Sequence, residues 1–262
     1  MIFVEGIFSY IIQFKVTTAL TDSFGTGAFS DIRHYLWLML IPLLAITGYK
    51  LFKKNQRLGI TMISILAIML FTVRFSNQTY RAITGIENPW TQAFPFHMCT
   101  VLTFLLPLTI LFKWKKIQTP VYVLSIMGGI ITALIGDYFD TIPFTYFGIE
   151  GISAHTLLII LPIYQIAVGK FKLEFRNSYS VFIGILVLMG WATLANEVFY
   201  VGLDPNYMYL RHNALPGDFG KENFFLVYVA IFFIFYLFIF GIPTIHRIMI
   251  QQKESHLNLN QE

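Results

Sequence analysis

The stretch FFLVYVAIFFIFYLFIFGIP, residues 224–243, decides the fold class of this chain because it contains no charged residue. A helix of about 20 apolar residues crosses a bilayer core of about 30 Å. Apolar residues occupy every side of this helix, so we expect it to face lipid. Of the 262 residues, 56% are hydrophobic and only 12% are charged. A soluble domain carries about twice that charged fraction, so we predict an all-α polytopic membrane protein.

Six earlier apolar stretches have similar lengths, so the sequence predicts a bundle of seven transmembrane helices. The predicted spans are residues 35–52, 59–75, 94–113, 120–138, 152–169, 179–200 and 224–246. Residues 2–16 are also apolar, but Glu5, Gln13 and Lys15 interrupt them. We therefore favour a short N-terminal interfacial helix there over an eighth span.

These spans divide the chain into three parts. An interfacial N-terminal segment covers residues 1–34, a seven-helix membrane domain covers residues 35–248, and a cytoplasmic tail covers residues 249–262. Hydrophilic stretches between the spans are too short for a soluble domain. The formal net charge of +4 is modest and no basic tract is present, so we expect a membrane partner and no nucleic acid.

Lysine and arginine residues are unevenly divided between the two ends of the predicted spans. Twelve of the 18 follow the first, third, fifth and last spans. Because cytoplasmic loops carry an excess of Lys and Arg, we place the N-terminus outside and the C-terminus in the cytoplasm of a multi-pass cell-membrane protein. The twelve are Lys50, Lys53, Lys54, Arg57, Lys113, Lys115, Lys116, Lys170, Lys172, Arg176, Arg247 and Lys253.

Other polar residues collect at the opposite, outer ends of the spans. Ionisable groups at membrane depth are costly and usually face the bundle interior or a wet cavity. We therefore predict an outward-facing polar pocket under the loops 137–152 and 201–223. Its candidate residues are His34, Arg74, His97, Cys99, Asp137, His155, Asn196, Glu197, Asn206, Tyr207 and Arg211.

The motif PFHMC, residues 95–99, places a histidine and the only cysteine at the start of the third span. Residues two apart on a helix point about 200° apart, so His97 and Cys99 are not expected to face each other as a dyad. If Cys99 is a nucleophile, its base comes from another helix, and His155 is the candidate. A lone cysteine also excludes an internal disulfide.

Small residues recur every fourth position in the predicted fourth span, forming two stripes that let neighbouring helices approach closely. One stripe is Ser125, Gly129 and Ala133, and the other is Gly128, Thr132 and Gly136. We interpret both stripes as packing surfaces.

Five motifs together resemble the YwaF-type bacterial integral membrane family, which is described as seven-helix. They are SDIRHYLWL (30–38), PFHMC (95–99), GGIITALIGD (128–137), AHTLLIILPIY (154–164) and NYMYL (206–210). A more distant resemblance is to a eukaryotic membrane family implicated in acyl transfer to ether phospholipids. In that family an acyl-carrying cysteine directly precedes the histidine of the third span. His97 and His155 match two of its histidines, but Phe96 stands at the cysteine position and Cys99 lies two residues after His97.

We therefore expect a membrane-embedded lipid-modifying enzyme that transfers acyl chains of phospholipids or lipoproteins, without a cofactor. His97 or His155 would act as general base or activate Cys99, and Asp137 would orient a histidine. Arg74 and Arg211 would bind phosphate. Asn206, Tyr207, Glu197 and His34 complete the expected substrate-binding set.

Two other functions remain open. A metal-dependent lipid hydrolase would use His34, His97 and His155 with Asp137 as zinc ligands. The last helix lacks the paired histidines of known seven-helix zinc hydrolases, so we favour the metal-free enzyme. A transporter or a lipid- or solute-binding protein is the third possibility, in which Arg74 and Glu197 pair only to hold the second and sixth spans together.

Overall fold

The structure is a computed structural model that describes residues 32–84, 94–135, 146–199, 205–213 and 220–244. These residues form only helices and the turns between them, which confirms the all-α prediction. The α-helices are α2 (Ile32–Lys54), α3 (Gln56–Thr84), α5 (Met98–Leu111), α6 (Lys115–Ile135), α7 (Tyr146–Ala167), α8 (Tyr179–Leu194) and α9 (Phe224–Tyr236). Two π-helices, η4 (Ala195–Phe199) and η8 (Leu237–Gly241), continue α8 and α9. Short 3-10 turns occur at η3 (Phe175–Asn177), η5 (Tyr207–Tyr209) and η7 (Lys221–Asn223).

Six helical segments among the described residues are long and apolar enough to cross a membrane. They lie within α2, α3, α6 and α7, and along α8 and α9 with their flanking turns. The segment containing α9 has the highest mean hydropathy, 2.8, and α9 itself has no buried residue. Its apolar surface therefore suits contact with lipid, as the sequence predicts.

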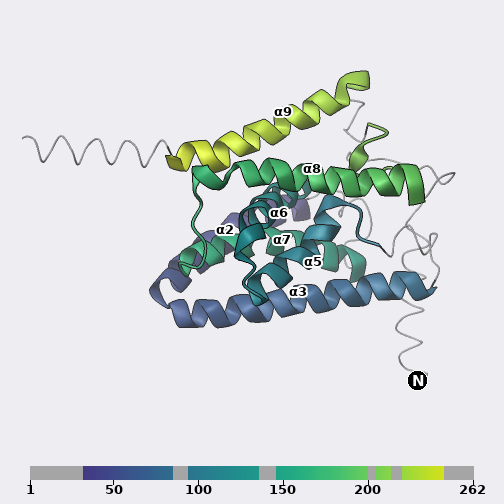
Figure 1. The fold of residues 1–262 in the computed structure, drawn as a ribbon. Helices are drawn as coiled ribbons and strands as arrows, with labels where there is room; N and C mark the ends of the chain where they lie inside the picture. The colour runs from purple at the N-terminus through teal and green to yellow at the C-terminus, as the bar shows by residue number, and fades with distance from the viewer. Residues whose placement is uncertain (1–31, 85–93, 136–145, 200–204, 214–219, 245–262) are drawn as a thin grey trace, which may run out of the picture.

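Helices α6 and α7 form the centre of the bundle. Tyr122 and Val123 on α6 and Leu158 and Leu161 on α7 are fully buried. Helices α2, α3 and α5 pack against α7, whereas α8 packs against α6. Helix α9 lies outermost and runs beside α8 (Figure 1). The Phe182 ring of α8 meets three aromatic rings in α9.

Two adjacent glycines set the spacing of α6 from its neighbours. A Cβ on Gly128 would lie 3.1 Å from the Cys99 Sγ of α5. A Cβ on Gly129 would lie 2.9 Å from the His155 carbonyl oxygen of α7 and 2.6 Å from Ile159 Cγ1. The absence of side chains thus lets α5 and α7 approach α6 from two directions. The predicted small-residue stripes serve packing, and they set how closely His155 and Cys99 approach α6.

We expect Gly129→Ala to lower the free energy of unfolding by about 1–3 kcal/mol, because a backbone oxygen beside the new methyl group cannot rotate away. Thermal unfolding of the detergent-purified protein measures this change. Gly190→Ala is the matched control, since nothing lies within 4 Å of the Cβ position on that exposed helical glycine. Equal melting temperatures for the two variants would contradict the close approach of α6 and α7.

The basic segments gather at one end of the bundle. The turn between α2 and α3, the start of α8 and the end of α9 lie at the same end (Figure 1). Gln118 near the start of α6 donates a hydrogen bond to the Lys170 carbonyl oxygen at 3.3 Å. The rings of Phe175 and Phe240 meet edge to face with centroids 6.5 Å apart. This arrangement is the one that the positive-inside rule requires, and the orientation across the membrane stays a prediction.

Helix α5 is shorter than the predicted span 94–113. It has 14 residues, which gives a length of about 21 Å. Pro95 disfavours a helical conformation at Phe94. The Trp191 indole donates a hydrogen bond to the Pro95 carbonyl oxygen at 2.8 Å, and the Phe96 ring stacks on the Trp191 ring. Because this contact holds residues 94–96 outside the helix, α5 begins only after His97.

Two other helices extend beyond their predicted ends. Helix α3 continues to Thr84, so Arg74 lies ten residues before its end rather than at its end. Helix α7 begins at Tyr146, so His155 is its tenth residue rather than one of its first. Both differences place charged or polar residues deeper in the helices than hydropathy indicates. The predicted N-terminal helix, Asp137 and the tail lie outside the described residues.

Candidate functional site

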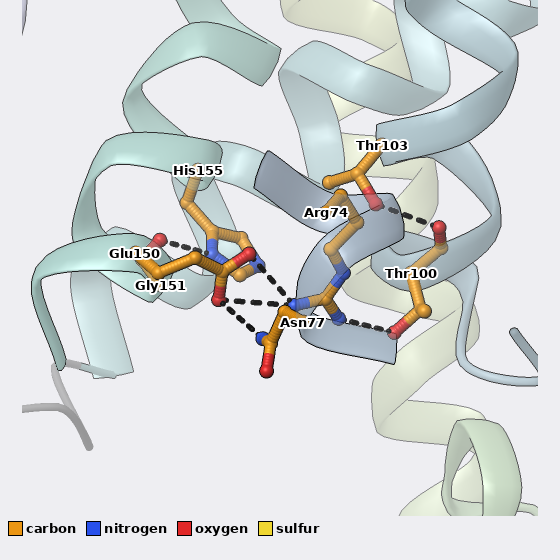
Figure 2. A network of polar contacts seen from close by, with 7 residues as sticks. All are labelled: Arg74, Asn77, Thr100, Thr103, Glu150, Gly151 and His155. Carbon is orange, nitrogen blue, oxygen red and sulfur yellow. Dashed lines mark hydrogen bonds and ion pairs between the residues drawn. The ribbon is translucent and has the colours of Figure 1, made fainter. Parts of the chain in front are cut away.

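A network of charged and polar side chains joins α3, α5 and α7 (Figure 2). Arg74 Nη1 donates to both carboxylate oxygens of Glu150, at 3.0 and 3.1 Å. Asn77 Nδ2 donates to Glu150 Oε2 at 3.1 Å. Arg74 Nη2 donates to Thr100 Oγ1 at 3.1 Å. The guanidinium group therefore ties three helices together at one level of the bundle.

The ion pair of this network is largely buried. The side chain of Glu150 is 4% exposed and that of Arg74 is 17% exposed. A buried carboxylate is tolerated only when it is paired and hydrogen-bonded, and Glu150 meets both conditions. Arg74 Nε is also buried, but it has no hydrogen-bond partner among the described residues. A buried donor of this kind suits an acceptor oxygen from a bound molecule.

His155 lies one turn after Glu150 on α7, and its ring points to the same side as the Glu150 carboxylate (Figure 2). His155 Nδ1 lies 2.8 Å from the Gly151 carbonyl oxygen. Because a carbonyl oxygen only accepts hydrogen bonds, Nδ1 carries the proton. The neutral ring then has its lone pair on Nε2, which is the nitrogen that a general base needs. The side chain is buried, with 8% exposed.

His97 occupies the position before the first residue of α5 and has an extended backbone. Its Nδ1 accepts a hydrogen bond from the Met208 backbone N–H at 3.3 Å. Because a backbone N–H only donates, Nδ1 is unprotonated and Nε2 carries the proton. The rings of Tyr207 and Tyr209 lie 5.1 and 5.6 Å from the His97 ring, centroid to centroid. His97 is therefore held as a neutral donor, the opposite hydrogen-bonding state from His155.

Arg74 connects the two helices that carry the histidines, because it binds Thr100 of α5 and Glu150 of α7. Thr100, which binds Arg74, lies three residues after His97, whereas Glu150 lies five residues before His155. The two imidazoles are thus carried by helices that share the Arg74 network, and a common site for them stays a prediction.

The segment 205–213 packs over His97 and is closed by its own hydrogen bonds. Asn206 Oδ1 accepts from the backbone N–H groups of Arg211 and His212, at 3.1 and 3.2 Å. Arg211 Nε donates to Glu197 Oε1 at 3.0 Å, and these two side chains are 32% and 53% exposed. The Asn206 side chain therefore shapes the turn, whereas Arg211 and Glu197 form an exposed rim.

Cys99 and His34 lie against α6. The Cys99 Sγ is 3.8 Å from Thr132 Oγ1. His34 is fully buried, and its Nε2 donates to the Ala133 carbonyl oxygen at 2.8 Å. The hydrogen bond from His34 therefore joins α2 to α6. Within residues 32–84, 94–135, 146–199, 205–213 and 220–244, no three His, Cys, Asp or Glu side chains form a group that could hold a metal ion.

The sequence model of the TMEM164 family matches residues 28–244. This range contains every residue that the structure describes. The chain belongs to the TMEM164 family. The match leaves the YwaF-type resemblance unconfirmed. No curated protein and no solved structure matches the sequence.

The structure corrects one predicted contact in this TMEM164 family member. Arg74 pairs with Glu150 and not with Glu197, which pairs with Arg211 instead. The reason is that α7 begins earlier than predicted and carries Glu150 to the level of Arg74. Of the predicted zinc ligands, His34 donates a hydrogen bond to α6 and Asp137 lies outside the described residues, so the zinc site stays a prediction.

Sequence reasoning missed three residues of the network in this TMEM164 family member. They are Asn77, Thr100 and Glu150. A signal for Glu150 was present, since an isolated acidic residue stands in the mainly apolar stretch between Phe144 and Leu161. A buried acid needs a basic partner, and Arg74 is the only basic residue between Leu58 and Tyr80 of another apolar helix. Asn77 and Thr100 are too ordinary in helices to be recognised without coordinates.

Proposed function

We propose that this TMEM164 family member is a membrane-embedded acyltransferase that moves an acyl chain between phospholipids, or from a phospholipid to a lipoprotein, in the outer leaflet of the cell membrane. The observation that supports the proposal is the opposite hydrogen-bonding state of two histidines on the two helices that Arg74 joins. One ring offers a lone pair and the other offers an N–H. Acyl transfer needs both, because it moves a proton and develops negative charge on a carbonyl oxygen.

In the proposed reaction, the hydroxyl oxygen of the acceptor lipid attacks the ester carbonyl carbon of the donor lipid. The hydroxyl proton passes to His155 Nε2. The carbonyl oxygen gains negative charge, and the His97 Nε2–H donates a hydrogen bond to it. When the intermediate collapses, the bond to the donor's glycerol oxygen breaks and that oxygen takes the proton from His155. The acyl chain is then on the acceptor, and both histidines return to their starting states.

The two arginines would have different roles. Glu150 neutralises Arg74, so we assign Arg74 to a neutral oxygen of the substrate, which its buried Nε–H can bind. Arg211 lies on the exposed rim and is assigned to a headgroup phosphate, which would compete with Glu197 for the guanidinium. Asn206 and Tyr207 would line the entry for the headgroup.

The proposed reaction has no covalent cysteine intermediate. The Sγ of Cys99 lies beside Thr132 of α6, whereas both histidines hydrogen-bond to other parts of the bundle. Cys99 is not assigned as the nucleophile, because direct transfer needs only a base and a donor to the carbonyl oxygen.

Acyl transfer is tested with purified protein in phospholipid vesicles that contain an acyl-labelled phospholipid and an unlabelled lysophospholipid acceptor. Mass spectrometry of the lipids follows the label. We expect transfer to the acceptor by the wild-type protein and none in protein-free vesicles. Cys99→Ala is expected to react at close to the wild-type rate. Its complete inactivity, together with a labelled thioester on the wild-type protein, would refute direct transfer. Bound lipid without any turnover would instead support a lipid-binding protein.

A further inference from the structure

Asn196 is a buried asparagine whose side chain binds the backbone of a single residue. It is 1% exposed. Its Oδ1 accepts from the Tyr207 N–H at 2.8 Å, and its Nδ2 donates to the Tyr207 carbonyl oxygen at 3.1 Å. Both ends of the amide are therefore used to hold the segment 205–213 against the end of α8. A hydrocarbon side chain of similar size would leave two buried backbone groups without these partners.

The π-helix η4 gives Asn196 and its neighbour separate roles. Asn196 faces inward beside Ala195, which is fully buried. Glu197 faces outward, where it pairs with Arg211. π-Helical turns are rare and often occur at functional sites. This π-helix directs the Asn196 amide to the buried Tyr207 backbone and the Glu197 carboxylate to the exposed Arg211 side chain.

The next two residues of the segment have an unusual backbone. Met208 and Tyr209 have φ values of 54° and 55°, in the left-handed region that non-glycine residues seldom occupy. Such a conformation persists only where the surroundings hold it. The Asn196 side chain binds the backbone of Tyr207, which directly precedes these two residues. The resulting turn directs the Met208 N–H at His97 Nδ1, 3.3 Å away.

We propose that Asn196 is a positioning residue for His97. Through the Tyr207 backbone it holds the Met208 N–H on Nδ1, which keeps His97 neutral with its proton on Nε2. The inference rests on the proposed acyl transfer for its catalytic meaning, because that reaction uses the His97 Nε2–H as an oxyanion donor. Nothing in the sequence links Asn196 to His97, since the contact passes through a residue of a third segment.

The tautomer of His97 is measured by nitrogen NMR of the full-length protein in lipid nanodiscs, with ¹⁵N-labelled histidine. His97→Ala identifies the signals of His97. We expect the wild-type ring to show a protonated Nε2 and an unprotonated Nδ1. In Asn196→Leu we expect the signals of both tautomers, because the Met208 N–H is no longer held in place. A wild-type ring protonated on Nδ1, or an unchanged tautomer in Asn196→Leu, would overturn the proposal.

Two further variants separate positioning from a general loss of stability. Asn196→Asp, when its buried carboxyl is protonated, keeps both contacts, since one oxygen accepts the Tyr207 N–H and the O–H donates to the Tyr207 carbonyl oxygen. It is expected to keep most of the wild-type tautomer even if Asn196→Leu fails to fold. Asn55→Leu is the matched control, because the Asn55 side chain also accepts from a backbone N–H, that of Leu58, but near the opposite end of the bundle. It is expected to leave the His97 signals unchanged, and altered signals there would overturn the proposal.

The acyl-transfer assay then distinguishes this inference from the proposed function. Asn196→Leu is expected to lower kcat about 100-fold with little change in KM, the effect of a misplaced catalytic group. A wild-type protein with the expected tautomer but without transfer activity would refute the proposed function alone. Normal transfer by an Asn196→Leu protein with mixed tautomers would refute the positioning role alone.

Discussion

Glu150→Ala is expected to lower the free energy of unfolding by about 3–5 kcal/mol, the cost of leaving one member of a buried ion pair without its partner. The variant leaves the Arg74 guanidinium with Thr100 as its remaining hydrogen-bond partner among the described side chains, and it removes one acceptor of Asn77. Because Arg74 is only 17% exposed, water replaces the lost carboxylate poorly. Unfolding by SDS in mixed micelles, followed by tryptophan fluorescence, measures the change.

Two comparisons isolate the buried pair. Glu197→Ala removes the acid of the exposed pair with Arg211 and is expected to change the stability by at most about 1 kcal/mol. The double variant Arg74→Met with Glu150→Leu removes both buried charges and is expected to recover most of the loss, since apolar residues can replace a buried pair at little cost. A Glu150→Ala protein as stable as Glu197→Ala would show that the Arg74–Glu150 pair is not buried as described.

The second large effect is expected from exchanging each histidine for glutamine. His155→Gln is expected to lower the rate of acyl transfer by about 10²–10⁴-fold, because a glutamine amide cannot accept and return a proton as a general base. His97→Gln is expected to retain much more activity, since the amide N–H₂ can still donate a hydrogen bond. His97→Leu has no donor and is expected to lose about 10²–10³-fold, as in the removal of one oxyanion donor.

The same labelled-lipid assay measures all three variants, with melting temperatures to verify folding. The order of rates is informative among variants of similar melting temperature, because a purely structural role for either histidine predicts that activity falls only where stability falls. If His155→Gln stays active while His97→Gln loses all transfer, the two assigned roles are reversed. His34→Gln is the control for a buried histidine that hydrogen-bonds elsewhere, to the Ala133 carbonyl oxygen of α6.

Much of the fold follows from local properties of the sequence. The uncharged run 224–243 predicts a lipid-facing helix, and α9 has no buried residue. The stripes of Gly128 and Gly129 predict close helix packing, and α6 does approach α5 and α7 at those positions. Helix ends were less predictable. Pro95 and the Trp191 hydrogen bond shorten α5, whereas α7 begins at Tyr146, before Glu150, whose charge Arg74 of α3 neutralises.

The candidate site could likewise be predicted only in part. His97, His155 and Arg74 could be selected from the sequence because polar residues are rare in apolar spans and collect near one end of them. The nitrogen that carries the proton in each histidine could not be predicted in this way. Whether a histidine carries its proton on Nδ1 or Nε2 depends on the group that faces Nδ1, which is a carbonyl oxygen for His155 and a backbone N–H for His97.

The sequence by itself determined that this protein is a membrane-embedded helical bundle, because hydropathy acts on each segment independently of its neighbours. Only the tertiary structure decided that Arg74 pairs with Glu150, that Asn196 binds the Tyr207 backbone, and that Nδ1 faces a carbonyl oxygen in His155 but a backbone N–H in His97. These features depend on which groups from other helices lie within about 3 Å of each side chain, since hydrogen bonds and buried ion pairs act only at that range.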